Sequence, residues 1–447
     1  MLHVKFLHQY LATFSALLNV ICIGCHEAWT SVYIPQLSHD NNVLKITRDE
    51  SLWITLVFFL GTLIGCSISL AVTDKFGRKP TILMTAVPFF ISFITLAYAK
   101  SIIVFYMIRI IAGVATGLTL VVLPLYICEI ADPQIRGALG TFIYIFNLLG
   151  FLFMNVLGSY VSIKISSLIF STIPMTLTLT FIWMPESPYF LAMKQNFIEA
   201  RISLVKFNRQ MNVENDFERL RDVVKAETEN SGKFCEIFTK LSNRKALFIE
   251  FILLNGKQLT GDDLFDVYAQ LIFAQFLQTV SPTLIVAVYY VIKLIMTVIS
   301  SLLIDTVGRR PVLFFSFLFS GIILLLLGIY LYLKLHTTVH VSSLEYIPIS
   351  LLILFAVFYS FIAPVPAIMV GELFPMNVKV FASLLCEIYF AILSMIVIYF
   401  FEMTYRYLGT DVSFFTFSFS CFFHFVLVYF FVLETKGKTL EEIQTTL

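Results

Sequence analysis

Long apolar stretches alternate with short polar segments along almost the whole chain. A bilayer core about 30 Å thick is crossed by a helix of about 20 apolar residues. Twelve stretches meet this requirement, which predicts an all-α membrane protein of twelve transmembrane helices. The predicted spans are 9–30, 51–73, 81–99, 103–127, 139–161, 165–184, 246–273, 283–304, 311–333, 347–370, 380–401 and 411–433.

The first and seventh predicted spans differ from a simple lipid-facing helix or could be mistaken for another element. The first, 9–30, has no small-residue cleavage site and is followed by further spans, so we interpret it as a retained helix and not as a signal peptide. The seventh, 246–273, contains the polar run from Asn255 to Asp263, which a lipid-facing helix would not carry. We therefore expect this span to line the interior of the helix bundle.

The composition supports a membrane protein. Hydrophobic residues make up 59% of the 447 residues and charged residues only 13%, whereas charged residues are about 25% of a soluble globular chain. Soluble enzymes, nucleic-acid binders and secreted disulfide scaffolds are excluded by this balance. The sequence contains no phosphate-binding loop, catalytic triad or zinc motif, so we expect no enzymatic activity, cofactor or metal. The predicted partners are the lipid bilayer and a small-molecule solute, with no nucleic acid.

Basic residues predict the orientation of the spans, because cytoplasmic loops are enriched in lysine and arginine. With both termini in the cytoplasm, the inner segments hold 21 of the 30 basic residues and the outer loops hold six. We therefore expect a multi-pass protein with cytoplasmic termini, in the plasma membrane.

One long polar segment, 185–245, divides the chain. Apolar residues recur in it at helical spacing between acidic and basic ones, which predicts short amphipathic cytoplasmic helices. The predicted organisation is an N-terminal six-helix bundle, a linker, a C-terminal six-helix bundle and a cytoplasmic tail, over residues 1–184, 185–245, 246–433 and 434–447.

The two halves repeat the same loop motifs. Asp74-Lys-Phe-Gly-Arg-Lys-Pro80 follows the second span, and Asp305-Thr-Val-Gly-Arg-Arg-Pro311 follows the eighth. An acidic residue and a base also follow the fourth and tenth spans, and a glutamate follows the sixth and twelfth. Parallel repeats of six helices are the plan of the major facilitator superfamily.

These repeated charges predict a gate at the cytoplasmic end. We expect ion pairs that join helix ends within and between the halves and separate when the halves move. The alternative is that the same residues only anchor the loops in the cytoplasm. The predicted gating residues are Asp74, Arg78, Lys79, Glu129, Arg136, Glu186, Asp305, Arg309, Arg310, Glu372, Lys379 and Glu434.

Several stretches resemble the signatures of the sugar-porter family. They are Pro124-x-Tyr-x-x-Glu-Ile-x-x-Pro-x-x-Arg-Gly137, Pro185-Glu-Ser-Pro188, Gly371-Glu-Leu-Phe-Pro375 and the run from Glu434 to Ile443. Within that family the chain resembles insect facilitative hexose and trehalose transporters. The resemblance implies transport of a small polar solute by alternating access. Tyr189 and Lys379 depart from the family pattern at positions where arginine is usual, which predicts a weaker inner gate.

The resemblance also implies where a solute binds, and here the chain diverges from the family. Gln258 matches a sugar-contacting amide, while Lys257, Asp263 and Lys293 place charges in a region that is neutral in relatives. Because unpaired charge at that depth is costly, we expect pairing, for example of Asp263 with Lys293. The remaining candidate binding residues are Tyr144 and Tyr268.

Three interpretations of this charged region stay open. The ion pairs could shape a site for a charged or zwitterionic solute. They could instead lock the halves and leave a transport-poor sensor or scaffold. In the third interpretation, which the family resemblance favours, the region still binds a sugar through Gln258, Asp263 and Tyr268.

A set of three residues bears on the energy source. Arg109 matches an arginine that neighbours a proton-binding aspartate in symporters of the family, and His26 stands at the aspartate position, followed by Glu27. Either residue could bind a proton. We favour simple neutralisation of Glu27 by Arg109, and therefore facilitated diffusion.

Overall fold

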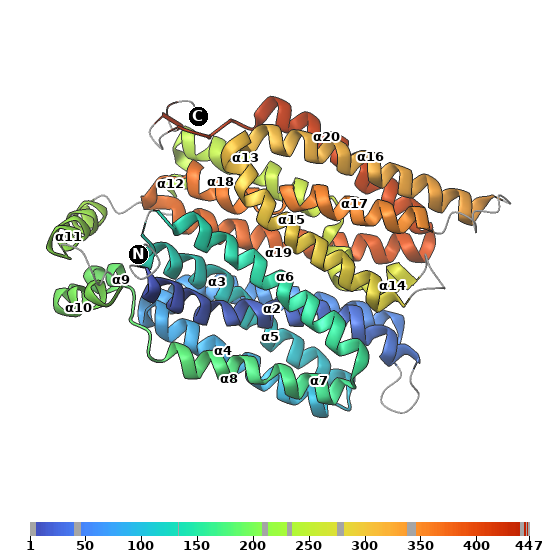
Figure 1. The fold of residues 1–447 in the computed structure, drawn as a ribbon, viewed down its shortest axis with the longest axis horizontal. Coiled ribbons are helices and arrows are strands. Elements are labelled where there is room, and N and C mark those ends of the chain that lie inside the picture. Colours follow the sequence, from blue (N-terminus) through green and yellow to red (C-terminus); the bar gives the residue numbers. More distant parts are fainter. Residues whose placement is uncertain are drawn as a thin grey trace.

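The computed structural model shows a bundle of long helices and describes residues 6–39, 46–132, 134–207, 213–229, 235–274, 281–337, 346–438, 442–443 and 445. The first seven helices lie together as one group (Figure 1). They are α2 (Leu7–His39), α3 (Arg48–Phe76), α4 (Arg78–Tyr98), α5 (Ile102–Ile130), α6 (Arg136–Tyr160), α7 (Ile163–Phe170) and α8 (Thr172–Phe181).

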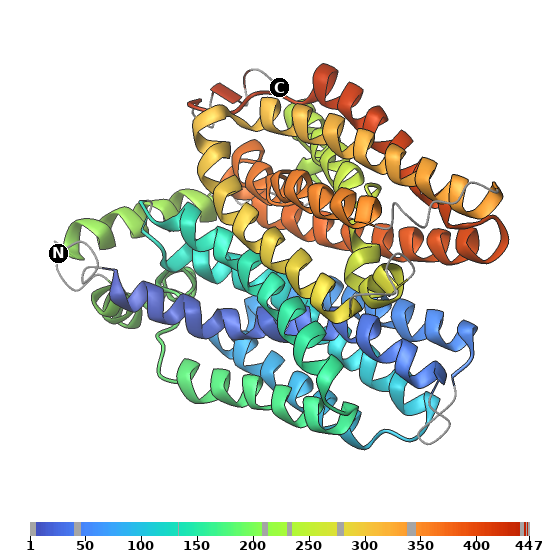
Figure 2. The ribbon, with the colours of Figure 1, turned by 45° about the vertical axis from the view of Figure 1, so that its right-hand side comes forward.

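A second group packs beside the first and contains the later long helices (Figures 1 and 2). These are α13 (Leu241–Gln258), α14 (Asp262–Ala274), α15 (Pro282–Val307), α16 (Arg309–His336), α17 (Tyr346–Ile362), α18 (Val365–Leu373), α19 (Met376–Tyr407) and α20 (Thr410–Phe431).

Eleven helical segments of the described residues are long and apolar enough to cross a membrane. They coincide with eleven of the twelve predicted spans, with bounds that differ by several residues because the helices continue into polar flanking sequence. The predicted seventh span, 246–273, is instead split between α13 and α14. Its polar centre breaks the helix.

Short helices occupy the linker, as its amphipathic pattern predicts. They are α9 (Pro188–Met193), α10 (Phe197–Phe207), α11 (Val213–Glu229) and α12 (Glu236–Thr239). All four lie at one end of the bundle, the end at which α3 finishes and α4 begins (Figure 1). We call it the linker end, and the other the far end.

Large apolar side chains cover the outside of the bundle. Leu302, Ile396 and Phe419 are examples of exposed residues on three different long helices. Such a surface is unfavourable in water and suits a lipid environment, because monomeric soluble proteins rarely expose extended apolar patches.

Small residues bring α3 and α5 into close contact. A Cβ at Gly113 would clash with the carbonyl oxygen of Phe58, and one at Gly117 would clash with that of Thr62. Because any larger side chain would push the helices apart, this pair of glycines in the first half serves packing.

Candidate functional site

A break in the seventh predicted span places polar groups in the interior of the second half. Gly261 has φ +79°, a conformation that side chains with a Cβ rarely adopt, and it separates α13 from α14. Gln258 therefore ends α13, while Asp262 and Asp263 lie in the first turn of α14. Carboxylates are stabilised there by the positive end of the helix dipole.

Lys293 is the buried cation at the centre of this region. Its side chain is fully buried on α15, and its Nζ lies 2.6 Å from Asp262 Oδ2 and 3.5 Å from Asp266 Oδ1. The tyrosine rings of Tyr289, Tyr290 and Tyr359 surround the same ammonium group at 5.1–5.9 Å from their centroids. Two carboxylates and three aromatic rings thus compensate the loss of water around this charge.

The expected pairing of Lys293 with Asp263 is wrong, since Asp262 and Asp266 are its partners. The reason is the helical period: residues four apart share one face, so Asp262 and Asp266 both face Lys293 and Asp263 turns about 100° away.

Asp263 instead lies near Gln258. The Gln258 amide donates a hydrogen bond of 2.7 Å to Ser394 Oγ, and Asp263 interacts with the same serine. Within the described residues, Gln258 Oε1 and Asp263 Oδ2 are buried acceptors without a hydrogen-bond partner. A buried acceptor without a donor is costly, so a hydrogen-bond donor brought to these two oxygens would stabilise the region.

The other candidate binding residues lie around this centre at different places. Tyr144 of α6 interacts electrostatically with Lys293 across the two halves. Lys257 places its Nζ 4.7 Å from the centroid of the Phe390 ring. Tyr268 is further toward the far end, where its ring packs on Phe401. Tyr144 and Lys293 thus lie at the acidic start of α14, while the Tyr268 ring contacts Phe401.

The residues considered for proton coupling do not form the expected pair. Arg109 is buried and donates hydrogen bonds to the backbone carbonyls of Ile54 and His26, while the Glu27 carboxylate accepts one of 3.3 Å from Asn147. Arg109 and Glu27 therefore form no direct ion pair among the described residues, although the two side chains interact electrostatically. The Phe58 ring also lies 4.3 Å from the guanidinium carbon of Arg109.

His26 and Glu27 face different surroundings. The His26 ring is buried inside the first half, stacked on Phe93 and within 2.8 Å of Ser92 Oγ. Glu27 interacts electrostatically with Asp263 and Asp266 of the second half. Glu27 is thus the one of the pair that faces the charged centre.

At the linker end, each half holds an arginine against two carboxylates. Arg78 Nη2 lies 2.9 Å from Glu129, and its Nη1 lies 3.7 Å from Asp74. In the second half, Arg309 Nη2 lies 2.8 Å from Glu372 and 2.9 Å from Asp305. The repeated motifs thus build the same arrangement twice.

Two glutamates extend this repeat. Glu186 accepts hydrogen bonds from the backbone N–H of Lys79, and Glu434 from the backbone N–H groups of Arg309 and Arg310. Each carboxylate therefore sits at the N-terminus of a helix, where negative charge is favoured. Burial nevertheless raises the pKa of Glu186 above its ordinary value.

The remaining predicted gating bases bind backbone in the described part of the chain. Their side chains donate to carbonyl oxygens: Lys79 to Ile182, Arg136 to Ala131, Arg310 to Tyr429 and Lys379 to Gly371. The predicted gating residues form four ion pairs, and each pair lies within a single half, two in the first half and two in the second. The expected pairs between the halves are thus absent at the linker end among the described residues, because the helix-end carbonyls have taken up these bases.

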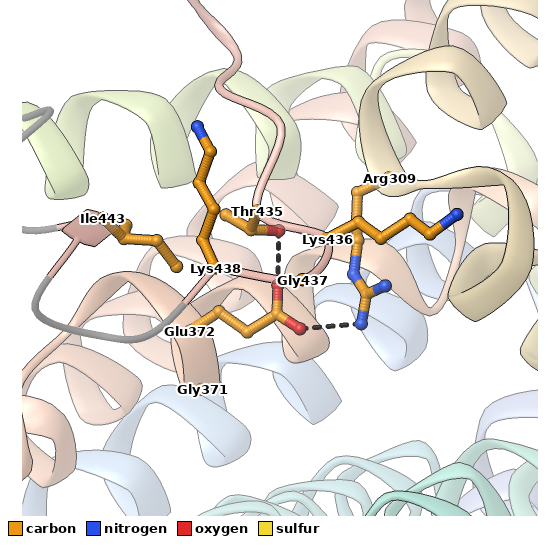
Figure 3. A pocket seen from close by; sticks show the side chains of 8 residues that line it. All are labelled: Arg309, Gly371, Glu372, Thr435, Lys436, Gly437, Lys438 and Ile443. Atoms are coloured by element: carbon orange, nitrogen blue, oxygen red, sulfur yellow. Dashed lines mark hydrogen bonds and ion pairs between the residues drawn. The ribbon is translucent and has the colours of Figure 1, made fainter.

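A recess at the same end is lined by part of this charge cluster (Figure 3). Glu372 lies between Arg309 and Thr435, whose hydroxyl donates to it over 2.6 Å. Lys436, Lys438 and Ile443 of the tail segment close the recess. The tail therefore contacts Glu372 through the Thr435 hydroxyl, while Lys436 Nζ donates to the carbonyl oxygen of Thr306.

The glycines before the two arginines provide a test of this arrangement. Gly308 has φ +111°, and a Cβ there would lie 2.6 Å from Glu434 Oε2. We expect Gly308→Ala to lower the free energy of unfolding by about 1–3 kcal/mol through backbone strain and displacement of Glu434. Thermal unfolding of the purified protein measures this. Gly140→Ala is the control, since a Cβ at Gly140 meets nothing within 4 Å; equal effects of the two changes would contradict the arrangement.

Some residues of the centre were not singled out from the sequence. Tyr289 and Tyr290 precede Lys293 by four and three residues, a spacing that places both on the lysine's face of a helix. That signal was available. Ser394 and Tyr359 carry no comparable signal, since their neighbours come from distant parts of the chain.

Comparison with known proteins identifies the family. Residues 12–447 match the family described as "Sugar (and other) transporter". The facilitated trehalose transporter of Bombyx mori is 31% identical over 443 residues, which cover 98% of this chain and 86% of the relative. The facilitated trehalose transporter of Drosophila virilis is 28% identical, and the chain spans 48% of its length, about half.

Solved structures show the fold. The proton:xylose symporter XylE, a protein of the major facilitator superfamily, was solved with 6-bromo-6-deoxy-D-glucose bound and superposes with a TM-score of 0.80. The alignment covers 99% of both chains at 20% sequence identity. The predicted all-α fold of two helical bundles is therefore confirmed.

Proposed function

Since the chain belongs to the sugar (and other) transporter family, we propose that it carries a neutral sugar, of hexose or trehalose type, by facilitated diffusion. As a multi-pass membrane protein of this family, it is a transporter and not an enzyme. The relatives from Bombyx mori and Drosophila virilis are named as facilitated trehalose transporters.

The observation that carries the proposal is the pair of unsatisfied acceptors beside Ser394. Gln258 Oε1 and Asp263 Oδ2 are buried without a donor in the described residues. A sugar presents several hydroxyl donors, which would satisfy such oxygens. We assign Gln258 and Asp263 as the principal binding residues, with Lys257, Tyr144 and Tyr268 around them.

Lys293 has a different role in this proposal. Because Asp262 and Asp266 already occupy its ammonium group, it is not free to bind an anionic solute. It orients the start of α14 and so holds Asp263 in place. Lys293 therefore gives no reason to expect an organic anion as the solute.

Transport would proceed by relative movement of the two bundles, 1–184 and 246–433, joined by the linker 185–245 and followed by the tail 434–447. The arginine–carboxylate clusters of the linker end stiffen each bundle, so that the bundles move as units. The excess of basic residues on one side supports cytoplasmic termini, and we place the protein in the plasma membrane.

Facilitated diffusion is favoured over proton coupling by the surroundings of Arg109. This arginine is fixed by backbone carbonyls and by the ring of Phe58. Protonation of Glu27 therefore does not release it.

Uptake by cells that express the protein tests the function. We expect saturable uptake of trehalose or a hexose that needs no imposed proton gradient, because an uncoupled carrier is driven by the solute gradient alone. Preferential uptake of an organic anion would support the charged-solute alternative. No uptake of any solute class, with the protein present at the cell surface, would support a sensor or scaffold.

A further inference from the structure

Four charged residues at the far end connect the two halves. Arg48 and Asp49 begin α3 in the first half, while Glu402 and Arg406 lie near the end of α19 in the second. Arg48 Nε lies 2.6 Å from Glu402 Oε1, and Arg406 Nη2 lies 2.7 Å from Asp49 Oδ1. Each half supplies one acid and one base to this group, which we call the interbundle cluster.

Glu402 is the centre of the interbundle cluster. It is 5% exposed and is approached by both arginines, with Arg406 3.4 Å away. The Arg48 guanidinium also lies over the ring of Tyr405, 4.3 Å from its centroid. A buried carboxylate held by a cation from the other half is costly to leave unpaired, so this contact resists separation of the halves.

The two ends of the bundle differ in how their charges are used. At the linker end, the ion pairs of Arg78 and Arg309 lie within single halves. At the far end, two ion pairs, Arg48–Glu402 and Asp49–Arg406, connect the halves. There, Gln270 of α14 adds hydrogen bonds of 3.1 Å to Ser31 and 3.2 Å to Ser159 of the first half.

We propose that the interbundle cluster is a latch that keeps the far end closed and must break each time this end opens. The proposal rests on the proposed function in one respect, since alternating access requires the far end to open. In the proposed orientation this is the extracellular end, so the latch controls entry of solute from outside.

Thr55 provides a reporter position for opening. It is fully buried on α3, near the interbundle cluster, and its side chain lies beside Tyr268 of the second half. A cysteine at this position would be shielded while the halves are latched and accessible when they separate. Cys421 is buried on α20 against Gly321 of α16, both in the second half, and reports general unfolding instead.

The experiment measures the rate at which a maleimide labels each cysteine of purified Thr55→Cys protein, with peptide mass spectrometry to separate the sites. We expect Glu402→Gln to raise the labelling rate at position 55 about tenfold. This increase lies between the small effect of removing a solvent-exposed ion pair and the large effect of removing a fully buried one. Arg48→Gln should act similarly, and the two changes together should add little, because they remove the same contact.

Glu236→Gln is the matched control. It removes an ion pair of equal length, 2.6 Å to Lys240, that does not connect the halves, and it should leave the labelling rate unchanged. If Glu402→Gln also exposes Cys421, the protein has unfolded. Asp49→Asn at the solvent-exposed edge of the cluster then decides, with a smaller increase of about two- to threefold, because water solvates this carboxylate.

The latch is refuted if position 55 stays shielded in the folded variants, or if the effects of Arg48→Gln and Glu402→Gln add in full. The labelling measurement uses no solute. If the protein takes up no sugar, the proposed function is refuted, but the labelling result still decides whether the latch exists.

Discussion

Replacing both Asp262 and Asp266 with asparagine is expected to lower the free energy of unfolding by about 3–5 kcal/mol, the cost of leaving a buried charge without its partners. Lys293 is fully buried, and these two carboxylates are its ion-pair partners among the described residues. Asp262→Asn alone should cost less, because Asp266 still faces the ammonium group. Thermal or denaturant unfolding of the purified protein measures the series.

Two further variants identify the cause of this loss. Asp263→Asn neutralises the neighbouring carboxylate, which is not a partner of Lys293, and should change stability by less than about 1 kcal/mol. Adding Lys293→Met to the double asparagine variant should recover most of the lost stability, since an apolar side chain replaces the unpaired charge. A triple variant as unstable as the double would show that the lysine's charge is not the cause.

Arg78→Leu is expected to have the second largest effect, a loss of about 2–4 kcal/mol. Arg78 and its partner Glu129 are both nearly buried, with side chains 5% and 7% exposed. The corresponding pair of the second half is wetter, since Glu372 is 27% exposed. Arg309→Leu should therefore cost about 1 kcal/mol, because water can solvate the carboxylate that remains.

Unfolding temperatures of the two variants, measured side by side, test this asymmetry. The pair is matched in sequence, since both arginines follow the glycine of a repeated loop motif. A larger loss for Arg309→Leu than for Arg78→Leu would mean that burial of the carboxylate does not set the cost.

The fold could be predicted from the sequence because its signals are local and strong. Spans such as 51–73 and 311–333 are continuous apolar runs, and an apolar run of this length indicates a membrane helix. The break at Gly261 could be anticipated only as a polar interruption. Whether such an interruption bends, breaks or ends a helix depends on what packs against it, here the ring of Phe417.

The partners of the charged residues were harder to predict. Lys293 and its acidic surroundings could be found from the sequence, but the choice of Asp262 over Asp263 depends on the point at which α14 begins. The pairing of Arg48 with Glu402 joins residues 354 positions apart, and nothing in either local sequence indicates the other. Contacts between the halves are set by packing of whole bundles, which a single sequence does not display.

Counterflow of radiolabelled trehalose and glucose in proteoliposomes tests the central claim most directly, because exchange without a gradient requires a sugar to bind and the site to alternate. The account predicts saturable counterflow that falls at least about tenfold in Gln258→Leu, where the amide is lost, and persists in Gln36→Leu, an exposed position on α2. Absence of counterflow for every sugar tested, or equal counterflow in Gln258→Leu and the unaltered protein, would contradict a sugar site at Gln258.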